Sequence, residues 1–490
     1  MMGESMQGRI RLICKISIVV VWVGLVVGLL RRDVFITSIT ADERALLSQA
    51  ENEVYQAIYF KHAKIGYVIN QYDARGDTTL RINQQAVMRL QVAEMEQRIV
   101  LRLQADVLAD NSLKNFTFSF DSPFYRMQAR GTVTGKIVAF ELQTGSATIR
   151  NQVVVDRPPV LPTARRGYLL RGEIQPGDKV RLPSFDPLRL TAKETVIVYK
   201  GRDKVLINGR VLQLHKFTEM FSGVGINFWL NDTGDVVKEE SPAGFVFVKE
   251  PKFKALAMGK GGEELFSSVS VTGDMPDLTG CKRMQYRLGL PEGTFELSGG
   301  RQRFADPILT VTMETVRKTD ASAGCGDMRG ACQATAYVQA HAPRIVALAE
   351  KIIAGEEDAV QQVRKLSTWV HENIEKRPVI GYPDALSTLD ARIGDCNEHA
   401  ALFAALARSI GIPTYIAAGV VHHKDAFYYH AWNEVCVNNM LLSLDTTTNQ
   451  VPADLTHLRF LRGEFDEQVQ VGALLGRLSI EPLPEKRCID

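Results

Sequence analysis

The sequence predicts an α+β protein with an N-terminal transmembrane helix, one or two antiparallel β-rich domains, and a C-terminal domain that combines helices with strands. Three observations lead to this prediction. An uncharged apolar run occupies residues 16–30, polar and apolar residues alternate through residues 50–258, and a helical period begins after Pro343. We therefore expect an anchor at 1–35, a β-rich domain at 50–258, a small β-rich unit at 261–340 and the mixed domain at 343–490.

The chain is long enough to fill more than one hydrophobic core. It has 490 residues, 45% of them hydrophobic, and a single core stops growing at about 250–300 residues. The formal net charge is only +2. Such a balance gives no basic surface of the kind that binds nucleic acid, so nucleic acid is not an expected partner.

Residues 1–35 have the pattern of a membrane anchor. Basic residues precede the apolar run, and Arg31 and Arg32 follow it. The uncharged part is slightly short for a span of about 20 residues, but Leu12 to Cys14 extend it if the Lys15 side chain reaches to the interface. A cleaved signal peptide is the alternative. No small-x-small cleavage site follows the run, which favours an uncleaved anchor.

The charges that flank the apolar run predict its orientation. Arg9, Arg11 and Lys15 precede it and two arginines follow it. This weak bias places the N-terminus in the cytoplasm. We therefore expect a single-pass protein of the cytoplasmic membrane, with the membrane as a partner and the bulk of the chain periplasmic or extracellular.

Residues 50–258 have the pattern of antiparallel β-structure. Apolar residues at 101, 103, 105 and 107 alternate with polar ones, and so do Phe116, Phe118 and Phe120. This is the period of a half-buried strand. Asn231 to Gly234 predicts a turn between two strands. We expect a curved sheet or open barrel that serves binding or spacing, because no catalytic residues cluster in it.

Residues 261–340 are rich in Gly, Pro and Thr and lack a helical period, which predicts the second, smaller β-rich unit. Within it, Cys325 and Cys332 bracket a turn-rich loop. Outside the cytoplasm these two cysteines would be able to form a disulfide, and two free thiols are the alternative. Cys436, in an alternating run further along the chain, is expected to be simply buried.

Two helices are predicted after Pro343. Apolar residues recur at spacings of one, three and four between Ala359 and Ile374, which indicates an amphipathic helix. A second helix is expected to start at Asp395, a good N-cap whose capping box is completed by Glu398. The Gly-Ile-Pro sequence at 411–413 supplies its stop signal.

Cys396 occupies the first position of this second helix. Unpaired amide N–H groups and the positive end of the helix dipole favour a thiolate at such a position. The other interpretation is a small buried hydrophobe that happens to begin a helix, which is the usual role of an isolated cysteine. The residues further along the chain favour the nucleophile.

His430 and Asp445 are expected to be neighbours on two adjacent strands. The Asn438-Asn439 pair suits a tight turn, which returns the strand carrying Asp445 alongside the strand carrying His430. In thiol enzymes a histidine accepts the thiol proton and a carboxylate orients the imidazole. We therefore predict Cys396 as the nucleophile, His430 as the base and Asp445 as the orienting acid.

His399 is the rival base, because it lies three residues after Cys396 on the same helix. It has no carboxylate at a helical spacing that would orient its ring, since Glu398 is committed to the cap. We expect a structural or supporting role for it.

Residues 366–481 resemble the transglutaminase-like superfamily, whose catalytic core has a papain-like fold. The resemblance rests on a Gly-Asp-Cys helix start at 394–396, the Gly-Ile-Pro helix end, a His-Ala-Trp strand at 430–432 and a strand ending in Asp445. It is nearest to bacterial, often membrane-attached members that also carry Cys-Asn-Glu-His, here 396–399, and an Ala-Asp-x-Thr-His tail, here 453–457. All three catalytic positions of the family are occupied.

The sequence departs from a common form of the family pattern after Asp445, where Thr446 stands in place of Pro. We expect this change to affect the strand end more than the chemistry. No Asp-x-Asp-x-Asp-Gly loop is present, so the calcium dependence of animal transglutaminases is not expected here. His422 and His423 do not have the spacing of zinc ligands. No metal or cofactor is expected.

The resemblance implies an enzyme that attacks amide or ester carbonyls through a thioester on Cys396, with a protein or peptide as substrate. Water would complete the reaction in a protease or deamidase, and an amine in a cross-linking enzyme. Tyr429 and Trp432 are candidates to line the substrate pocket, although lone aromatics are more often part of a core. An alternative function is an envelope binding or scaffold protein whose papain-like domain merely packs.

Overall fold

The computed structural model describes residues 53–483 except 76–78, 93–94, 109–110, 162, 171, 187–190, 222–223, 242, 259–274, 292–294, 316–324, 326–327, 425, 465–467, 469–470, 472–473 and 475–476. The anchor predicted at 1–35 lies outside these residues. Within the described part of the chain, no helix combines the length and the apolar character that crossing a membrane requires.

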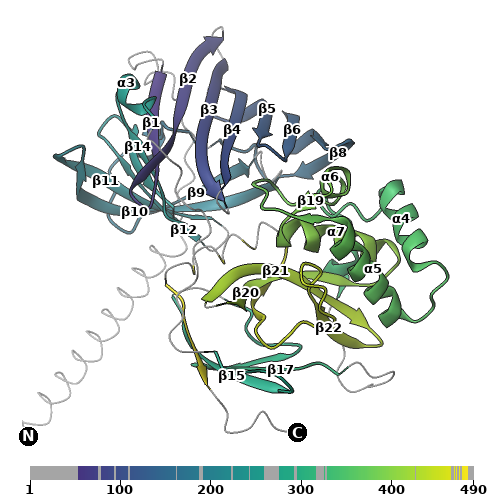
Figure 1. Ribbon diagram of the computed structural model, residues 1–490. Coiled ribbons are helices and arrows are strands. Elements are labelled where there is room, and N and C mark those ends of the chain that lie inside the picture. The colour runs from purple at the N-terminus through teal and green to yellow at the C-terminus, as the bar shows by residue number, and fades with distance from the viewer. Residues whose placement is uncertain are drawn as a thin grey trace, which may run out of the picture.

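One antiparallel sheet of 14 strands makes up the N-terminal half (Figure 1). Strand β1 pairs with β14 and so joins the first eight strands to the last six. Across the sheet the order is β8 (Ala147–Val154), β7 (Ile137–Thr144), β6 (Arg126–Thr134), β5 (Leu113–Asp121), β4 (Met95–Leu108), β3 (Thr79–Val92), β2 (Ala63–Arg75), β1 (Glu53–Phe60), β14 (Phe245–Lys249), β13 (Val236–Glu240), β12 (Val224–Leu230), β11 (Arg210–Phe221), β10 (Thr191–Ile207) and β9 (Lys179–Asp186). The predicted antiparallel sheet and the turn between β12 and β13 are confirmed.

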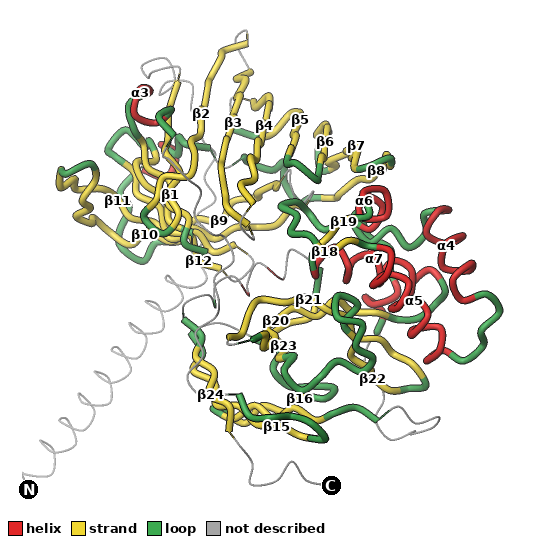
Figure 2. Tube along the Cα trace, viewed as in Figure 1, coloured by secondary structure: helices red, strands yellow, loops and turns green. Residues whose placement is uncertain are grey.

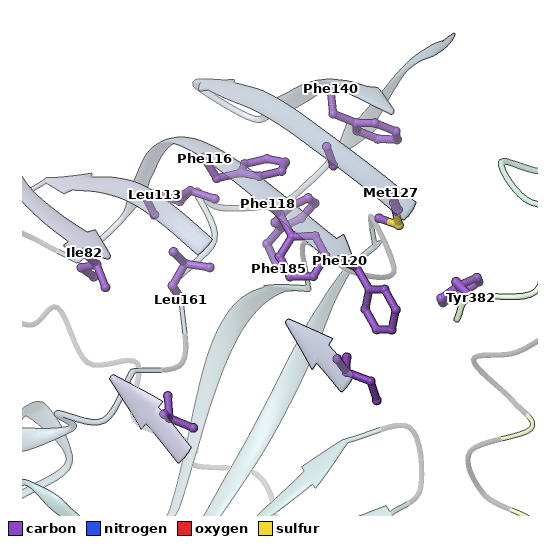
Figure 3. Close-up of a cluster of buried hydrophobic side chains, with 14 of the residues drawn as sticks. Ile82, Leu113, Phe116, Phe118, Phe120, Met127, Phe140, Leu161, Phe185 and Tyr382 are labelled. Carbon is purple, nitrogen blue, oxygen red and sulfur yellow. The ribbon is translucent and has the colours of Figure 1, made fainter. Parts of the chain in front are cut away.

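The alternating phenylalanines of β5 point into the core of this half. Phe116, Phe118 and Phe120 are buried, whereas Thr117 between them is exposed. Figure 3 shows the three rings beside Phe185 of β9, and the ring centroids of Phe116 and Phe185 lie 4.9 Å apart. The alternation of apolar and polar residues in the sequence predicts that one side of each strand is buried. The short helices η1 (Gly167–Leu170) and α3 (Lys252–Ala255) complete this half.

A small antiparallel sheet contains three strands from the middle of the chain and one from its C-terminal part. Its order is β16 (Gln302–Ala305), β17 (Ile308–Thr312), β15 (Arg283–Gly289) and β24 (Ser479–Leu483). Strand β24 belongs to the predicted C-terminal domain, yet it pairs with β15. The segment predicted as a separate small unit therefore shares a sheet with the last domain. The short helix η2 (Arg329–Cys332) follows it along the chain.

The C-terminal part has a second antiparallel sheet with helices on one side (Figure 2). The sheet order is β22 (Met440–Leu444), β21 (Ala426–Val437), β20 (Thr414–His423) and β23 (Leu458–Arg462). The helices are α4 (Pro343–Ile353), α5 (Ala359–Asn373), α6 (Ala385–Ala391) and α7 (Cys396–Ser409), and β18 (Glu375–Lys376) pairs with β19 (Ile393–Gly394). Helices α5 and α7 confirm the two predicted helices.

The two faces of this sheet cover different cores. Apolar residues of α4, α5 and α7 pack against Ala431 and Val435 of β21. Residues of β15 and β17 pack against Val420 of β20 and Phe427 of β21. The result is three layers, in which β20 to β23 lie between the helices and the small sheet (Figure 1). The strands that carry the predicted site are thus supported from both sides.

The 14-stranded sheet packs directly against the chain that leads into α6 and α7. Tyr382 and Val379 belong to the same core cluster as the phenylalanines of β5. A Cβ atom on Gly381 would lie only 2.6 Å from the ring of Tyr125, so this close approach requires glycine. The Gln97 side-chain amide donates to the Pro378 carbonyl at 3.0 Å. The N-terminal half therefore helps to fix the segment that precedes the active-site helix.

A disulfide connects Cys325 with Cys436 of β21. The Cα atoms of the two residues are 5.9 Å apart, and 111 positions separate them in the chain. Cys332 is free and exposed. The suggested Cys325–Cys332 disulfide is therefore wrong, and so is the expectation that Cys436 is simply buried. The short spacing between Cys325 and Cys332 suggested a disulfide within the loop. In the fold, β21 brings Cys436 to Cys325 instead. Cys281 is also disulfide-bonded.

Candidate active site

The start of α7 has the predicted capping box. The Asp395 carboxylate accepts the N–H of Asn397 at 2.8 Å, and Glu398 accepts the N–H of Asp395 at 2.9 Å. Cys396 is the first residue of the helix. Burial raises the pKa of Glu398 well above its usual range, and the neighbouring Asp395 adds to this rise. Glu398 is thus held in the cap as predicted.

The predicted hairpin brings His430 and Asp445 together. Asn438 and Asn439 have φ angles of 52° and 61°, which the tight turn between two antiparallel strands requires. Strand β21 pairs with β22, and Asp445 follows directly after β22. Backbone hydrogen bonds of 2.9 Å in both directions with Gln450 fix the position of Asp445. Its Oδ2 atom lies 3.1 Å from Nε2 of His430.

The environment of Asp445 keeps its carboxyl group ionised. Burial alone would raise the pKa, since the residue is only 1% exposed. Attraction to His430, together with hydrogen bonds from His430 and His457, outweighs the burial and holds the pKa well below its usual range. A carboxylate that stays charged is suited to orient an imidazole and to stabilise its protonated form.

The Cys396 thiol differs from the sequence-based expectation. The Cys396 side chain is half-buried. Burial raises its pKa well above the usual range, and the carboxylates of Asp395 and Glu398 raise it further, while the backbone N–H of Ala431 lowers it. This direction is opposite to the one that the helix start alone predicts for the thiol.

The backbone of β21 places the Cys396 thiol near the residue that follows His430. Ala431, which acts on the sulfur through its backbone N–H, directly follows His430 in β21. Because Nε2 of His430 faces Asp445, Nδ1 is the ring nitrogen left to accept a proton. This division of the two nitrogens is what a base with an orienting partner requires.

His399 is held against the start of its own helix. Its Nδ1 atom lies 2.7 Å from the Asp395 carbonyl oxygen, which belongs to the preceding turn of the same helix. The residue is fully buried, and burial lowers the pKa of its ring. A histidine held in this way keeps its ring against the helix start, and a backbone carbonyl takes the place of an orienting carboxylate.

The two aromatic candidates for substrate contact have different surroundings. Trp432 is only 2% exposed, and its ring stacks on His430 with centroids 6.2 Å apart. It therefore offers almost no surface to a substrate. Tyr429 is half-buried, and its hydroxyl lies 2.8 Å from the Asn397 side-chain oxygen. Burial and the nearby Cys396 thiol raise the pKa of Tyr429 well above its usual range, so Tyr429 remains the stronger candidate.

His457 and Asp454 extend the contacts around Asp445, and no role was predicted for either residue. Nε2 of His457 lies 3.4 Å from Oδ2 of Asp445, and Nδ1 lies 2.9 Å from Oδ1 of Asp454. One possible metal-ligand atom from each of His430, Asp445 and His457 lies within 4.8 Å of the other two. A metal ion could bridge atoms at this spacing. Hydrogen bonds within the cluster account for this approach without an ion. The signal that could have found both residues is the 453–457 tail motif.

Comparison with known proteins agrees with this geometry. Residues 346–446 match the family described as the transglutaminase-like superfamily. This part of the chain is a transglutaminase-like domain. The matched residues include Cys396, His430 and Asp445 but end before His457. A search of curated proteins gives no match.

Three solved structures have weak similarity to the chain. A proposed cysteine protease from Cytophaga hutchinsonii has 15% identity and a TM-score of 0.26, covering 41% of this chain and 81% of that one. A β-barrel-like protein of a domain of unknown function from Brucella abortus has 14% identity and a TM-score of 0.31, covering 41% and 96%. A proposed protease from Parabacteroides distasonis has 8% identity and a TM-score of 0.19, covering 70% and 68%.

Residues outside the transglutaminase-like domain support its site. The guanidinium of Arg301 donates to the Ser443 hydroxyl at 2.7 Å and also to the backbone carbonyls of Ala453 and Asp454. The Glu314 carboxylate accepts the N–H of Ser443 at 2.9 Å. Both residues come from the segment around β16 and β17. They therefore fix the strand that leads to Asp445 and the loop that carries Asp454, and no motif in the sequence indicated this role.

Proposed function

We propose that the chain is a thiol enzyme of transglutaminase-like type that cleaves or transfers amide or peptide acyl groups through a thioester on Cys396. The observation that carries this proposal is the hydrogen bond between His430 and the ionised Asp445, on strands beside the helix that begins with Cys396. A chain that only bound a partner would gain nothing from burying a charged carboxylate against a histidine next to a thiol.

The proposed chemistry begins with a protonated thiol, in line with the direction in which burial shifts the pKa of Cys396. Nδ1 of His430 takes this proton while the sulfur adds to the substrate carbonyl, and Asp445 stabilises the resulting imidazolium. The backbone N–H of Cys396 is a donor for the oxyanion. The imidazolium then returns the proton to the leaving amine, and the acyl group stays on sulfur as a thioester.

The second half of the reaction decides the product. Water, with its proton taken by His430, would release an acid, and an amine would give a cross-link. The acceptor depends on the shape of the cleft and on water exclusion rather than on the triad. We favour hydrolysis of peptide-like amides, with a protein or peptide as the substrate.

Acylation of Cys396 tests this function. When the full-length protein is mixed with an activated ester such as p-nitrophenyl acetate, we expect an acetyl group on Cys396, located by peptide mapping, and none at position 396 in Cys396→Ser. Because the thiol pKa is raised, iodoacetamide should label Cys396 more slowly than a free cysteine at mildly acid pH, and the rate should rise with pH. Absence of the acetyl group at any pH would leave the envelope scaffold as the better interpretation.

We further propose that residues 1–35 anchor the enzyme in the cytoplasmic membrane, with the remaining chain periplasmic or extracellular. The charged flanks of the apolar run support this. A reporter enzyme that works only outside the cytoplasm should show activity when it is fused after Asp490. Activity of a cytoplasm-specific reporter at the same position would contradict the topology. Release of a mature chain cut near residue 30 would favour the signal peptide instead.

A further inference from the structure

Asp445 is shared by two histidines rather than one. Its Oδ2 atom lies 3.1 Å from Nε2 of His430 and 3.4 Å from Nε2 of His457. The same oxygen accepts the Thr448 hydroxyl, and Oδ1 accepts the N–H of Thr447 at 2.8 Å. Four donors therefore surround one carboxylate. Its orientation toward His430 depends on all of them together.

His457 is itself held on its other side. Nδ1 of its ring lies 2.9 Å from the Asp454 carboxylate, and the edge of the ring meets Trp432 with centroids 5.2 Å apart. Asp454 in turn accepts the N–H of Thr456 at 2.8 Å and the Gln450 side-chain amide at 3.0 Å. The result is a continuous chain of contacts from Asp454 through His457 and Asp445 to His430.

The surroundings of His457 favour a protonated ring that donates on both sides. The residue is only 1% exposed, and burial alone would lower its pKa. Hydrogen bonds and attraction from Asp445 and Asp454 outweigh the burial and raise it. Among the residues that the structure describes, Arg301 is a further charged group near this chain, and its guanidinium binds the Asp454 carbonyl oxygen. A ring that donates from both nitrogens cannot turn without losing a bond to one of the two carboxylates.

We propose that His457 and Asp454 are positioning residues for the thiol chemistry, in which Asp454 orients His457, His457 holds Asp445, and Asp445 orients the base His430. This inference rests on the proposed function, since it assigns the residues to the same site. In metal sites, some groups bind the ring nitrogen of a histidine that faces away from the metal and so orient the ring. Replacing such a group typically lowers activity by about 10–100-fold. We expect an effect of this size here.

Two substitutions at one position separate positioning from packing. The amide of His457→Gln can place a donor near the position of Nε2, whereas His457→Leu fills space without a donor. We expect the maximal rate of Cys396 acylation to fall by about 10–100-fold in His457→Leu with little change in KM. His457→Gln should recover most of that rate. If His457 had a purely structural role, the loss of acylation rate in each variant would follow its loss of thermal stability. The presence of a side-chain hydrogen-bond donor at position 457 would then make no difference.

A matched control comes from His371, which lies 3.2 Å from the Thr446 carbonyl oxygen and 3.1 Å from that of Thr447, beside Asp445 but without a bond to its carboxylate. His371→Leu should lower the thermal midpoint while the acylation rate of the folded protein stays within about twofold. If His457→Leu does not fold, Asp454→Asn and His457→Gln are compared with the wild type. Asp454→Asn should then lower the maximal rate and leave KM unchanged.

The outcomes distinguish this inference from the proposed function. If the wild-type protein does not become acylated on Cys396, the proposed function fails. If the wild type is acylated and folded His457→Leu reacts at the same rate, the positioning role is excluded. Equal rates for the wild type and Asp454→Asn would exclude it in the same way.

Discussion

Replacing His430 with alanine is expected to lower the rate of Cys396 acylation by about 10²–10⁴-fold, the usual size of a general-base contribution. Burial raises the pKa of the Cys396 thiol, so its attack needs a base that takes the thiol proton. Without His430, no oriented group removes its proton during attack. The measurement is the single-turnover rate of acyl transfer from an activated ester. Asp445→Ala should also cause a strong loss, since the imidazole would lose its orienting partner at 3.1 Å.

The matched control is His399→Ala, on the same helix as Cys396. His399 is bound to a backbone carbonyl of that helix, so its removal should cost stability and leave most of the acylation rate. Cys396→Ser serves as the blank. A large loss in His399→Ala together with an active His430→Ala would mean that the assignment of the base is wrong.

Gly419→Ala is expected to destabilise the fold and to disturb the site together. Gly419 pairs with His430 of β21 on one side and faces β23 on the other. A Cβ atom at this position would overlap the carbonyl oxygen of Leu458, the residue after His457. Strand β23 would have to move, and His457 would move with it. We expect a loss of about 1–3 kcal/mol in the free energy of unfolding, with a reduced acylation rate.

Chemical denaturation of Gly419→Ala beside Gly225→Ala tests this expectation. Gly225 is also on a strand, but a Cβ atom there would make ordinary contacts of 3.4 Å with Thr218 and 3.5 Å with Met220. Its replacement should change stability by at most about 0.5 kcal/mol. Equal midpoints for the two variants would show that β23 can shift at no cost, and would contradict the argument from close approach.

The parts of the site that the sequence predicted are those encoded by local signals. Asp395 and Glu398 mark the helix start within four residues, and Asn438-Asn439 marks the turn that brings Asp445 beside His430. Each signal acts through backbone geometry over a few positions, so it holds whatever the rest of the chain does. The alternating phenylalanines of β5 were predictable for the same reason.

The features that the sequence did not predict depend on residues that are distant along the chain. The partner of Cys325 is 111 positions away, and Arg301 reaches Ser443 only because the small sheet packs on β20 to β23. The pKa of Cys396 followed from the whole surroundings of the sulfur, which the helix start alone does not describe. The strand order of the large sheet was not predicted either, because β1 pairs with β14, which lies far from it along the chain.

The pairing of β24 with β15 has a consequence for protein synthesis. Strands β15 to β17 carry part of their core against the C-terminal sheet. The small sheet gains its fourth strand, β24, only after Ser479–Leu483 have left the ribosome. Domains generally fold as units, from the N-terminal end first. The 14-stranded sheet, which uses only β1 to β14, can therefore form before β24 is synthesised, whereas the small sheet that packs against β20 to β23 is completed only afterwards.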